Sequence, residues 1–421
     1  MLINFYKAAC RSLLRNKIFS LLNISGLAIG MAACFFIFQY VHFERSYEKY
    51  NINADNVYRI PLEYHESSGN GYIEATNYPA VGPTMKANFP EVISFARLIP
   101  AKTMLGTTTI SRIEGGITKF SNNEKRIFFA DPAVLKMFSI PFIYGNDTTA
   151  LTQIRAIILS ASESKKYFGT ENPMNKTLFL NGSFPVTVTG VFKDIPENAH
   201  LKFDMLISFP DEKFQADNWN WSEFYTYVML TPGTNPKTLE GQFPAFMNRY
   251  LGLGTEGHNL KNQISLQPIK DIHLKSHYRK ELEVNGNEKD IWFLSILSFF
   301  VLLIACINYI NLSTAKVMER AGEVGLRKVI GASKFQLVWQ FLTESLMISF
   351  LAIVLAAFIV LVLAPFYQDL IGKPVTGWFG KSGLFGEGGF WIVLLLIIIG
   401  GSFLSAYTRH YSCPGTIRFM F

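Results

Sequence analysis

The hydrophobic and polar positions along this chain separate into four long apolar windows and one large region of mixed composition. The windows cover residues 18–43, 291–315, 335–368 and 388–408, and Glu344 is the one charged residue within them. A helix needs about 20 predominantly apolar residues to cross the hydrocarbon core of a bilayer, so each window is long enough. The pattern predicts four transmembrane helices, one near the N-terminus and three near the C-terminus.

Strand and helix signals alternate between the first and second windows. Runs rich in β-branched and aromatic residues predict strands at residues 155–159, 185–192, 225–230 and 264–269. Asp131 and Pro132 predict the N-cap and first residue of a helix that runs to Phe138, and a second helix over 160–168 is expected to end at Gly169. This mixture predicts a large α+β extracytoplasmic domain.

The charges that flank the windows predict the orientation of the chain. Basic residues outnumber acidic ones both before the first window and between the second and third. By the positive-inside rule these two segments are cytoplasmic, and the large domain lies outside. The expected organisation is a cytoplasmic amphipathic segment at 1–17, transmembrane helices at 18–43, 291–315, 337–366 and 390–408, a periplasmic domain at 44–290, a cytoplasmic coupling loop at 316–336, a short outer loop at 367–389 and an atypical tail at 409–421.

Composition narrows the class of protein further. Charged residues make up 17% of the chain, which carries a net charge of +7. Soluble domains average about 25% charged residues, so a single soluble domain is excluded. None of the four cysteines lies between Glu44 and Asp290, and we therefore expect this region to fold around a packed core without disulfides, as suits a bacterial envelope protein. The first window is interpreted as an uncleaved anchor, because its apolar run continues past Cys34.

The sequence contains few candidates for chemistry. The Gly-Lys-Ser sequence at 380–382 lacks the glycine that a phosphate-binding loop needs five residues earlier, where Val375 stands. His273 and His277 are spaced for zinc on one helical face, with Asp271 near enough to orient one of them. The surrounding sequence argues against a helix, however, and a third ligand is not evident. We expect no catalytic residue, metal or cofactor, and no nucleic-acid partner.

Glu344 is a candidate intramembrane polar site. An ionised carboxylate at mid-bilayer costs about 2.5 to 3.5 kcal/mol on insertion scales, which ordinarily indicates a relay or ion site. The residue lies roughly 15 Å along its helix from Lys334, at about 1.5 Å per residue. A role in helix packing near the cytoplasmic interface is therefore favoured over proton transfer.

The segment between the second and third windows is the most informative. It is charged, contains three glycines and keeps aliphatic residues among its cations. The pattern predicts a short amphipathic helix along the membrane surface that ends at Gly331, with Ser333 as the N-cap of the next helix. A loop that only fixes topology would not need the aliphatic stripe, so a protein partner is expected.

The sequence EVGLRKVIGASKFQLVWQFLTES in this segment resembles the signature of permease subunits in the MacB/FtsX-like class of ABC transporters. RSLLRNKIFSLLNISGLAIGMA resembles the first membrane helix of that class. DPAVLKMFSIPFIYGN, SESKKYFGTENPMNKTL and VTGVFKDIPENAHLKFD resemble its periplasmic domain, especially in Bacteroidetes-type members. The resemblance extends roughly over residues 1–405.

This resemblance implies a non-catalytic permease subunit that couples ATP hydrolysis by a separate ATPase to movement of its periplasmic domain, in mechanotransmission or efflux. It implies a multi-pass protein of the bacterial inner membrane with a cytoplasmic N-terminus. The implied partners are the separate ABC ATPase, a second permease copy or half, the lipid bilayer and a periplasmic protein. The implied ATPase-coupling residues are Glu319, Glu323, Gly325, Arg327, Lys328, Gly331, Ala332 and Ser333.

The sequence departs from the family after Ser405. Family members continue with a basic, proline-containing end or with a second permease half, and residues 407–421 match neither. We therefore expect a reading frame altered or truncated near residue 405, which would leave a single half. The alternative function is a membrane-anchored periplasmic binding or sensor protein without catalytic activity, although its short cytoplasmic segments leave no room for an output domain.

Overall fold

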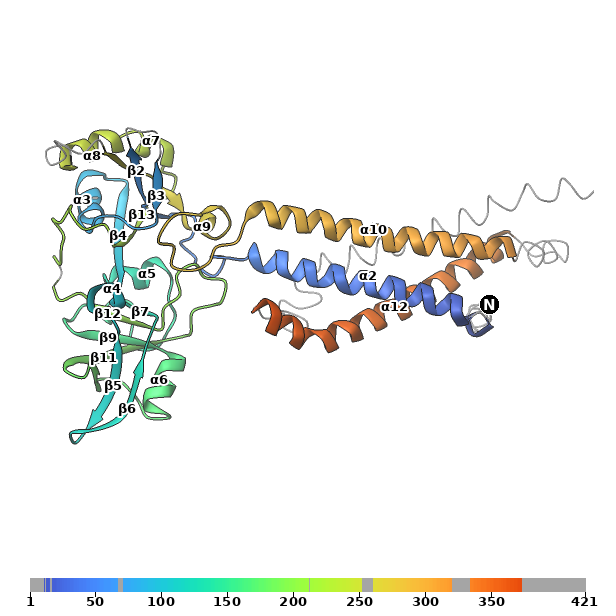
Figure 1. The fold of residues 1–421 in the computed structure, drawn as a ribbon, viewed down its shortest axis with the longest axis horizontal. Coiled ribbons are helices and arrows are strands. Elements are labelled where there is room, and N and C mark those ends of the chain that lie inside the picture. The colour runs from blue at the N-terminus through green and yellow to red at the C-terminus, as the bar shows by residue number, and fades with distance from the viewer. Residues whose placement is uncertain are drawn as a thin grey trace, which may run out of the picture. The chain divides into compact units, whose positions relative to one another are not determined.

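The computed structural model describes residues 11, 13–15, 17–66, 71–211, 213–251, 260–319 and 334–372. They belong to two compact units, each of which is described by itself. Glu44–Glu288 forms the sheet unit, and Met1–Phe43 with Lys289–Phe421 forms the helical unit. Figure 1 shows the strands gathered in the first unit and the long helices in the second.

The sheet unit is built on a 12-stranded mixed sheet (Figure 1). Its strands are β1 (Val57–Arg59), β4 (Val92–Pro100), β5 (Thr109–Glu114), β6 (Ile117–Asn123), β7 (Ile127–Ala130), β8 (Phe142–Tyr144), β9 (Ala156–Ser160), β10 (Thr177–Leu180), β11 (Phe184–Phe192), β12 (Met205–Ser208), β13 (Tyr225–Leu230) and β15 (Gln267–Pro268). They follow the order β15-β1-β13-β4-β7-β12-β9-β11-β10-β5-β6, and β8 pairs with β11. A smaller sheet has the order β14-β2-β3, with strands β14 (Leu260–Ile264), β2 (Leu62–Glu66) and β3 (Tyr72–Glu74).

The middle of the large sheet is covered on both faces. β9 pairs parallel with β11, and β12 pairs parallel with β7. Successive side chains of a strand point to opposite faces, and here Ile157 and Leu159 join one buried cluster while Ile158 joins another. The helices of this unit are α3 (Val81–Asn88), α4 (Ala101–Leu105), α5 (Ala133–Met137), α6 (Ala161–Phe168), α7 (Pro236–Glu240), α8 (Phe243–Leu251) and α9 (Ile269–Lys275). The predicted α+β class is confirmed.

The predicted end of α6 at Gly169 is confirmed, and Ser160, which was expected to be its first residue, is its N-cap. The Ser160 hydroxyl accepts a hydrogen bond from the Glu163 backbone N–H, as an N-cap does. Gly169 ends the helix with a φ of 64°, a conformation that glycine adopts without the steric cost borne by other residues. The strand predicted at 225–230 agrees with β13. The one predicted at 155–159 is shifted from β9 by one residue, and the one at 185–192 differs from β11 by one residue at its start.

The strand predicted over 264–269 and the cap predicted at Asp131 were both wrong. The strand expected over 264–269 is divided, because β14 ends at Ile264 in the small sheet and β15 joins the large one. Asp131 does not cap α5 with its side chain, and Pro132 occupies the N-cap position. The Asp131 carboxylate is instead bound by the buried Arg97, with Nε to Oδ2 at 2.8 Å and Nη2 to Oδ1 at 3.0 Å. The carboxylate thereby gains a cationic partner, which the backbone N–H groups of the helix would not provide.

The helical unit contains α2 (Lys17–Glu44), α10 (Glu288–Glu319) and α12 (Lys334–Ile371). By length and composition, Lys17–Glu44, Glu288–Asn311 and Thr343–Ile371 are able to cross a membrane. These spans agree with three of the four predicted transmembrane helices. The fourth, expected at 390–408, lies outside the described residues.

α2 and α10 approach each other closely at two glycines. A Cβ on Gly30 would lie 2.7 Å from the Cβ of Ala305, and a Cβ on Gly26 would lie 3.9 Å from Nδ2 of Asn308. One turn beyond Gly30, Sγ of Cys34 is 2.9 Å from Oγ of Ser298. Small residues four positions apart let membrane helices pack at backbone contact, where dispersion replaces the missing hydrophobic driving force.

We expect Gly30→Ala to destabilise the protein by about 1–3 kcal/mol, since the added methyl group overpacks the contact with Ala305. Ala305→Gly in the same chain should relieve the clash. Thermal unfolding of the full chain in detergent would therefore show a coupling between the two substitutions of roughly 1 kcal/mol. Ile29→Ala, on the exposed side of α2, is the control. Strictly additive effects of Gly30→Ala and Ala305→Gly would contradict the contact.

Candidate functional site

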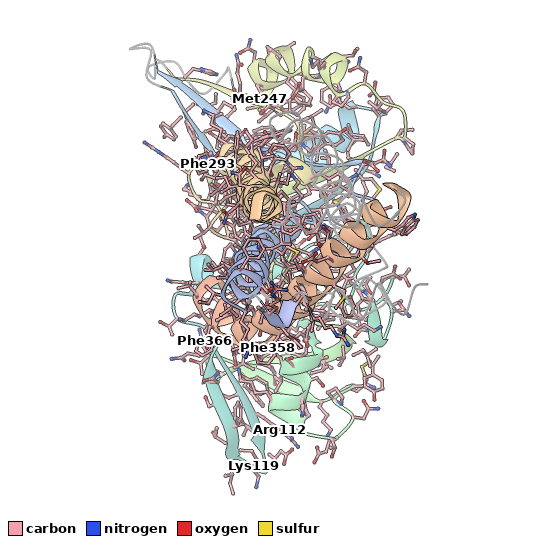
Figure 2. All side chains as sticks on the ribbon, turned by 90° about the vertical axis from the view of Figure 1, so that its right-hand side faces the viewer. Arg112, Lys119, Met247, Phe293, Phe358 and Phe366 are labelled. Atoms are coloured by element: carbon pink, nitrogen blue, oxygen red, sulfur yellow. The ribbon has the colours of Figure 1, made fainter. Side chains whose placement is uncertain are left out.

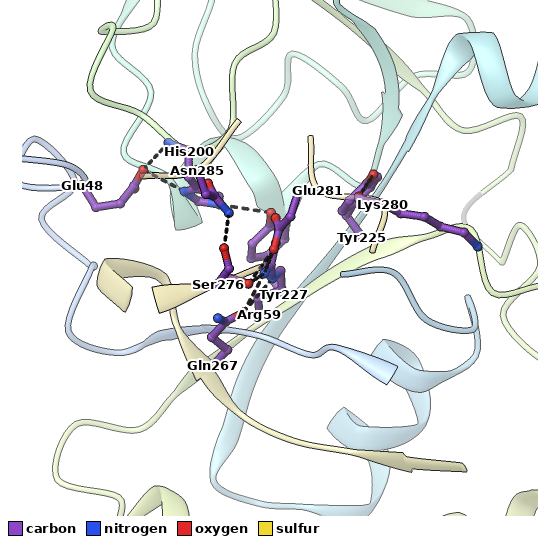
Figure 3. Close-up of polar contacts among 10 residues, drawn as sticks. All are labelled: Glu48, Arg59, His200, Tyr225, Tyr227, Gln267, Ser276, Lys280, Glu281 and Asn285. Atoms are coloured by element: carbon purple, nitrogen blue, oxygen red, sulfur yellow. Dashed lines mark hydrogen bonds and ion pairs between the residues drawn. The ribbon is translucent and has the colours of Figure 1, made fainter. Parts of the chain in front are cut away.

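The chain passes between the two units twice, after Glu44 at the end of α2 and before Glu288 at the start of α10. Within the sheet unit, the residues next to both passages join a buried polar network, which we call the clasp and which Figure 3 shows in part. The clasp consists of Glu44, Glu48, Arg59, His200, Tyr225, Tyr227, Gln267, His273, Ser276 and Glu281. The clasp joins strands of the large sheet to residues near the beginning and the end of the sheet unit.

Glu48 fastens the first passage to the sheet. Its side chain is 0% exposed, and Oε1 accepts a 2.8 Å hydrogen bond from the His200 backbone N–H. The same oxygen lies 2.7 Å from His200 Nδ1, and His200 Nε2 lies 3.1 Å from the hydroxyl of Tyr227 on β13 (Figure 3). Burial raises the pKa of Tyr227, so its hydroxyl stays protonated. Glu48 has a φ of 62°, a conformation that these bonds help to maintain.

Arg59 fastens the second passage. Its Nη1 and Nη2 donate to Oε2 and Oε1 of Glu281, each at 2.7 Å, in a bidentate pair (Figure 3). Nε and Nη2 also donate to Oε1 of Gln267 on β15, and Nη2 donates to the Ser276 hydroxyl. Burial alone would raise the pKa of Glu281, but the Arg59 and Ser276 hydrogen bonds hold it below its ordinary value, so the pair is ionised at neutral pH.

Further contacts hold the chain ahead of α10. The Tyr225 hydroxyl on β13 donates to the Lys280 carbonyl at 2.6 Å, and Asn285 Nδ2 donates to the Ser276 carbonyl at 3.0 Å. A Cβ on Gly286 would lie 2.6 Å from Oε2 of Glu44. The chain that returns toward α10 therefore runs directly against the residue that ends α2.

His273 provides the contact between these two segments. Its Nε2 lies 2.7 Å from Oε2 of Glu44, and its ring stacks on Tyr47 with the ring centroids 3.3 Å apart. Our interpretation of the segment around His273 as non-helical was wrong, because it belongs to α9, whose Ile269 and Ile272 are buried at helical spacing. His277 lies beyond the end of that helix and is exposed. Among the described residues, His, Cys, Asp and Glu form no group of three that could hold a metal ion.

The residues expected to couple to an ATPase lie mostly outside the described part of the chain. Residues 320–333, which include Glu323, Gly325, Arg327, Lys328, Gly331, Ala332 and Ser333, are not described. Glu319 is the last residue of α10, and α12 begins at Lys334. Glu344 on α12 is 5% exposed, and its neighbour Ser345 is fully buried. Glu344 therefore faces protein within the helical unit, as polar residues in membrane helices usually do.

A cavity of about 300 Å³ opens where the parallel strands β7 and β12 end. Asp131 and Pro132 after β7 line it, as do Ser208 and Phe209 at the end of β12. Crevices at the carboxyl ends of parallel strands are common ligand sites. Arg97 holds the Asp131 carboxylate from behind, so this acidic group is already neutralised within the fold. Lys86 and Asp211 also line the cavity, so both signs of charge remain at its wall.

Sequence reasoning missed the charged residues of the clasp. Arg59 follows Tyr58 and precedes Ile60, and Arg97 stands in the same way within the apolar run of β4. A single arginine inside an apolar strand pattern is a usable signal, because a buried guanidinium requires an acidic partner. Its partner, Glu281, lies 222 positions from Arg59, and nothing local identifies it.

Two family models match the chain. The MacB-like periplasmic core domain matches residues 20–246, and the FtsX-like permease C-terminal domain matches residues 295–411. The macrolide export ATP-binding/permease protein MacB of Pasteurella multocida (strain Pm70) is 24% identical over 212 residues, which are 50% of this chain and 30% of that protein. The uncharacterised ABC transporter permease YvrN of Bacillus subtilis (strain 168) is 22% identical over 365 residues, which are 83% of this chain and 84% of that permease.

The extracellular domain of the noncanonic ABC-type transporter YknZ from Gram-positive bacteria is 17% identical, with a TM-score of 0.33, and the match covers 49% of this chain and 98% of that domain. The chain spans less than half the length of the first four curated relatives that it matches. The first family match alone covers more than half of the chain. The chain therefore belongs to the MacB/FtsX-like permease family, with a MacB-like periplasmic core domain followed by an FtsX-like permease region.

Proposed function

We propose that this chain is the permease subunit of an ABC transporter, in which ATP hydrolysis by a separate ATPase subunit moves the periplasmic sheet unit. The observation that carries the proposal is the clasp. A domain that only bound a ligand outside the membrane could be connected to its membrane helices by flexible linkers. Here both connections to the long helices are fixed to one sheet by buried, hydrogen-bonded groups.

The clasp is suited to transmit force because breaking it is costly. Removing one partner of a buried ion pair costs about 3–5 kcal/mol, since the other charge is left uncompensated. Arg59 and Glu281 are 1% and 13% exposed, so their pair belongs to this class. A displacement of α10 along its axis would reach β1 through Glu281, and one of α2 would reach β13 through Glu48 and His200. Both paths end on neighbouring strands, because β1 pairs with β13.

In this proposal the ATPase binds the segment that joins α10 to α12. The protein is a multi-pass inner-membrane subunit with its N-terminus and this segment in the cytoplasm, a second permease copy beside it and a periplasmic partner outside. The basic and aliphatic composition of residues 320–333 supports ATPase contact. In this proposal the chain supplies no catalytic residue, and its role is to transmit motion.

We expect Glu323→Arg and Gly331→Pro to lower the recovery of the ATPase that co-purifies with the full chain by about ten-fold. Charge reversal at an interface pair costs several kcal/mol, and proline at position 331, where the sequence predicts the end of a helix, would redirect the backbone. Glu197→Arg is the control, since Glu197 lies in the sheet unit and is 60% exposed. Wild-type recovery with both variants would exclude the segment from ATPase binding.

We expect Glu281→Gln to leave ATPase recovery unchanged and to lower the stability of the sheet unit by about 3 kcal/mol, because Arg59 loses its charged partner. The matched control, Glu197→Gln, removes the exposed carboxylate of the pair with Lys202 and should change stability by less than about 0.5 kcal/mol. Thermal unfolding of the full chain followed by tryptophan fluorescence measures both.

The same pair of variants tests force transmission. In membranes with the ATPase bound, ATP should change the labelling rate of a single cysteine placed in the sheet unit. Glu281→Gln should abolish this change at temperatures where the unit stays folded, and Glu197→Gln should preserve it. An ATP response of wild-type size in Glu281→Gln would show that the clasp does not carry the motion.

A further inference from the structure

The cavity at the carboxyl ends of β7 and β12 is bounded by the strands on either side of them. β7 lies between β4 and β12 in the sheet, and β9 follows β12. Ser94 and Phe95 of β4 line one side of the cavity, and residues 151–154, which lead into β9, line the other. Its volume of about 300 Å³ is at the lower end of the usual range for ligand sites. A small ligand there would lie across the end of β7.

Two opposite charges line this cavity, and neither belongs to an ion pair among the described residues. Lys86 of α3 donates through Nζ to the carbonyl of Ile93, which places its ammonium group beside β4. Asp211 follows β12, and its Oδ1 accepts a 2.6 Å hydrogen bond from the Lys213 backbone N–H. β7 separates these two places, so the charges are anchored two strand spacings, about 10 Å, apart.

The carboxylate of Asp131, which also lines the cavity, is not available to a ligand. Both of its oxygens accept hydrogen bonds from the Arg97 guanidinium, and Oδ2 also accepts one from the Arg97 backbone N–H at 2.9 Å. This pair adds no net charge to the cavity. A ligand that satisfies Lys86 and Asp211 together therefore carries one anionic and one cationic group.

The wall also offers a hydrogen-bond donor and apolar surface. Ser208 is 5% exposed, and its Oγ accepts a 3.1 Å hydrogen bond from the Ala156 backbone N–H. Within the part of the chain that the structure describes, no acceptor takes the proton of this hydroxyl, which is therefore free to bind a carbonyl oxygen of a ligand. Phe95, Leu151 and Ile154 supply apolar surface in the same cavity.

We propose that this cavity binds a linear zwitterion of the size of a dipeptide, with its free amine at Asp211 and its carboxylate at Lys86. Two extended residues span about 7 Å, and a hydrogen bond at each end adds about 3 Å, which is enough to bridge the two charges. A single amino acid carries both charges on one residue and is too short. The carbonyl between the two ends accepts from Ser208, and an aliphatic side chain packs on the apolar wall. This inference goes beyond the proposed permease function and does not depend on it.

Isothermal titration calorimetry of the full chain in detergent, without ATPase, measures the affinity for alanyl-leucine. We expect Lys86→Gln and Asp211→Asn each to weaken binding by about ten-fold, because each removes one charge-assisted hydrogen bond. Both side chains are exposed, so these substitutions should leave the fold intact.

The matched controls are exposed residues that do not line the cavity, and both should bind alanyl-leucine as the wild type does. Lys119→Gln is the control for the lysine, and Figure 2 shows Lys119 near the free end of the hairpin of β5 and β6, pointing outward. Asp55→Asn is the control for the acid, since the Asp55 side chain is 80% exposed.

Capped forms of the dipeptide identify which end meets which side chain. N-acetylation should weaken binding to the wild type by about ten-fold and should have no further effect in Asp211→Asn. Amidation of the carboxyl end should behave in the same way with Lys86→Gln. Leucine alone should bind at least about ten-fold more weakly than alanyl-leucine. No binding of alanyl-leucine to the wild type, or equal binding of a dipeptide capped at both ends, would overturn the proposal and would leave the permease function untouched.

Discussion

The ion pair between Arg59 and Glu281 is the interaction on which the attachment of the sheet unit depends. The two residues stand 222 positions apart, one on the first strand of the unit and the other just before its exit. Neither charge could remain buried alone, because desolvation of a single ion costs more than the sheet could recover from packing around it. Their pairing brings the beginning and the end of the unit together and encloses the rest of the fold between them.

The class of fold could be predicted from the sequence, whereas the clasp could not. Apolar length identified the long helices, and Gly169 identified the end of α6, because those signals depend on neighbours in the chain. Asp131 was misread because a distant arginine competes for its carboxylate. His273 was misread for a similar reason: its helix is stabilised by the burial of Ile269 and Ile272 against the core, which overrides a weak local pattern.

The two parallel strand pairs give the sheet unit a continuous stiff centre. β7, β12, β9 and β11 lie side by side, and β12 and β9 are buried along their whole length. The cavity opens at one end of this centre, and the clasp lies on β1, β13 and β15 at one edge region of the same sheet. The intervening strands β4 and β7 join the two regions through backbone hydrogen bonds. A ligand in the cavity and a force on the clasp would therefore act on the same hydrogen-bonded sheet.

The glycine contact between α2 and α10 limits how these helices can move. The methyl group of Ala305 on α10 packs against the backbone of Gly30 on α2. If one helix slid along the other, this methyl group would collide with the next turn of α2. Tilting or turning of the two helices together leaves the contact intact. In the proposed function, the two helices would therefore move together as one rigid pair and would not slide along each other.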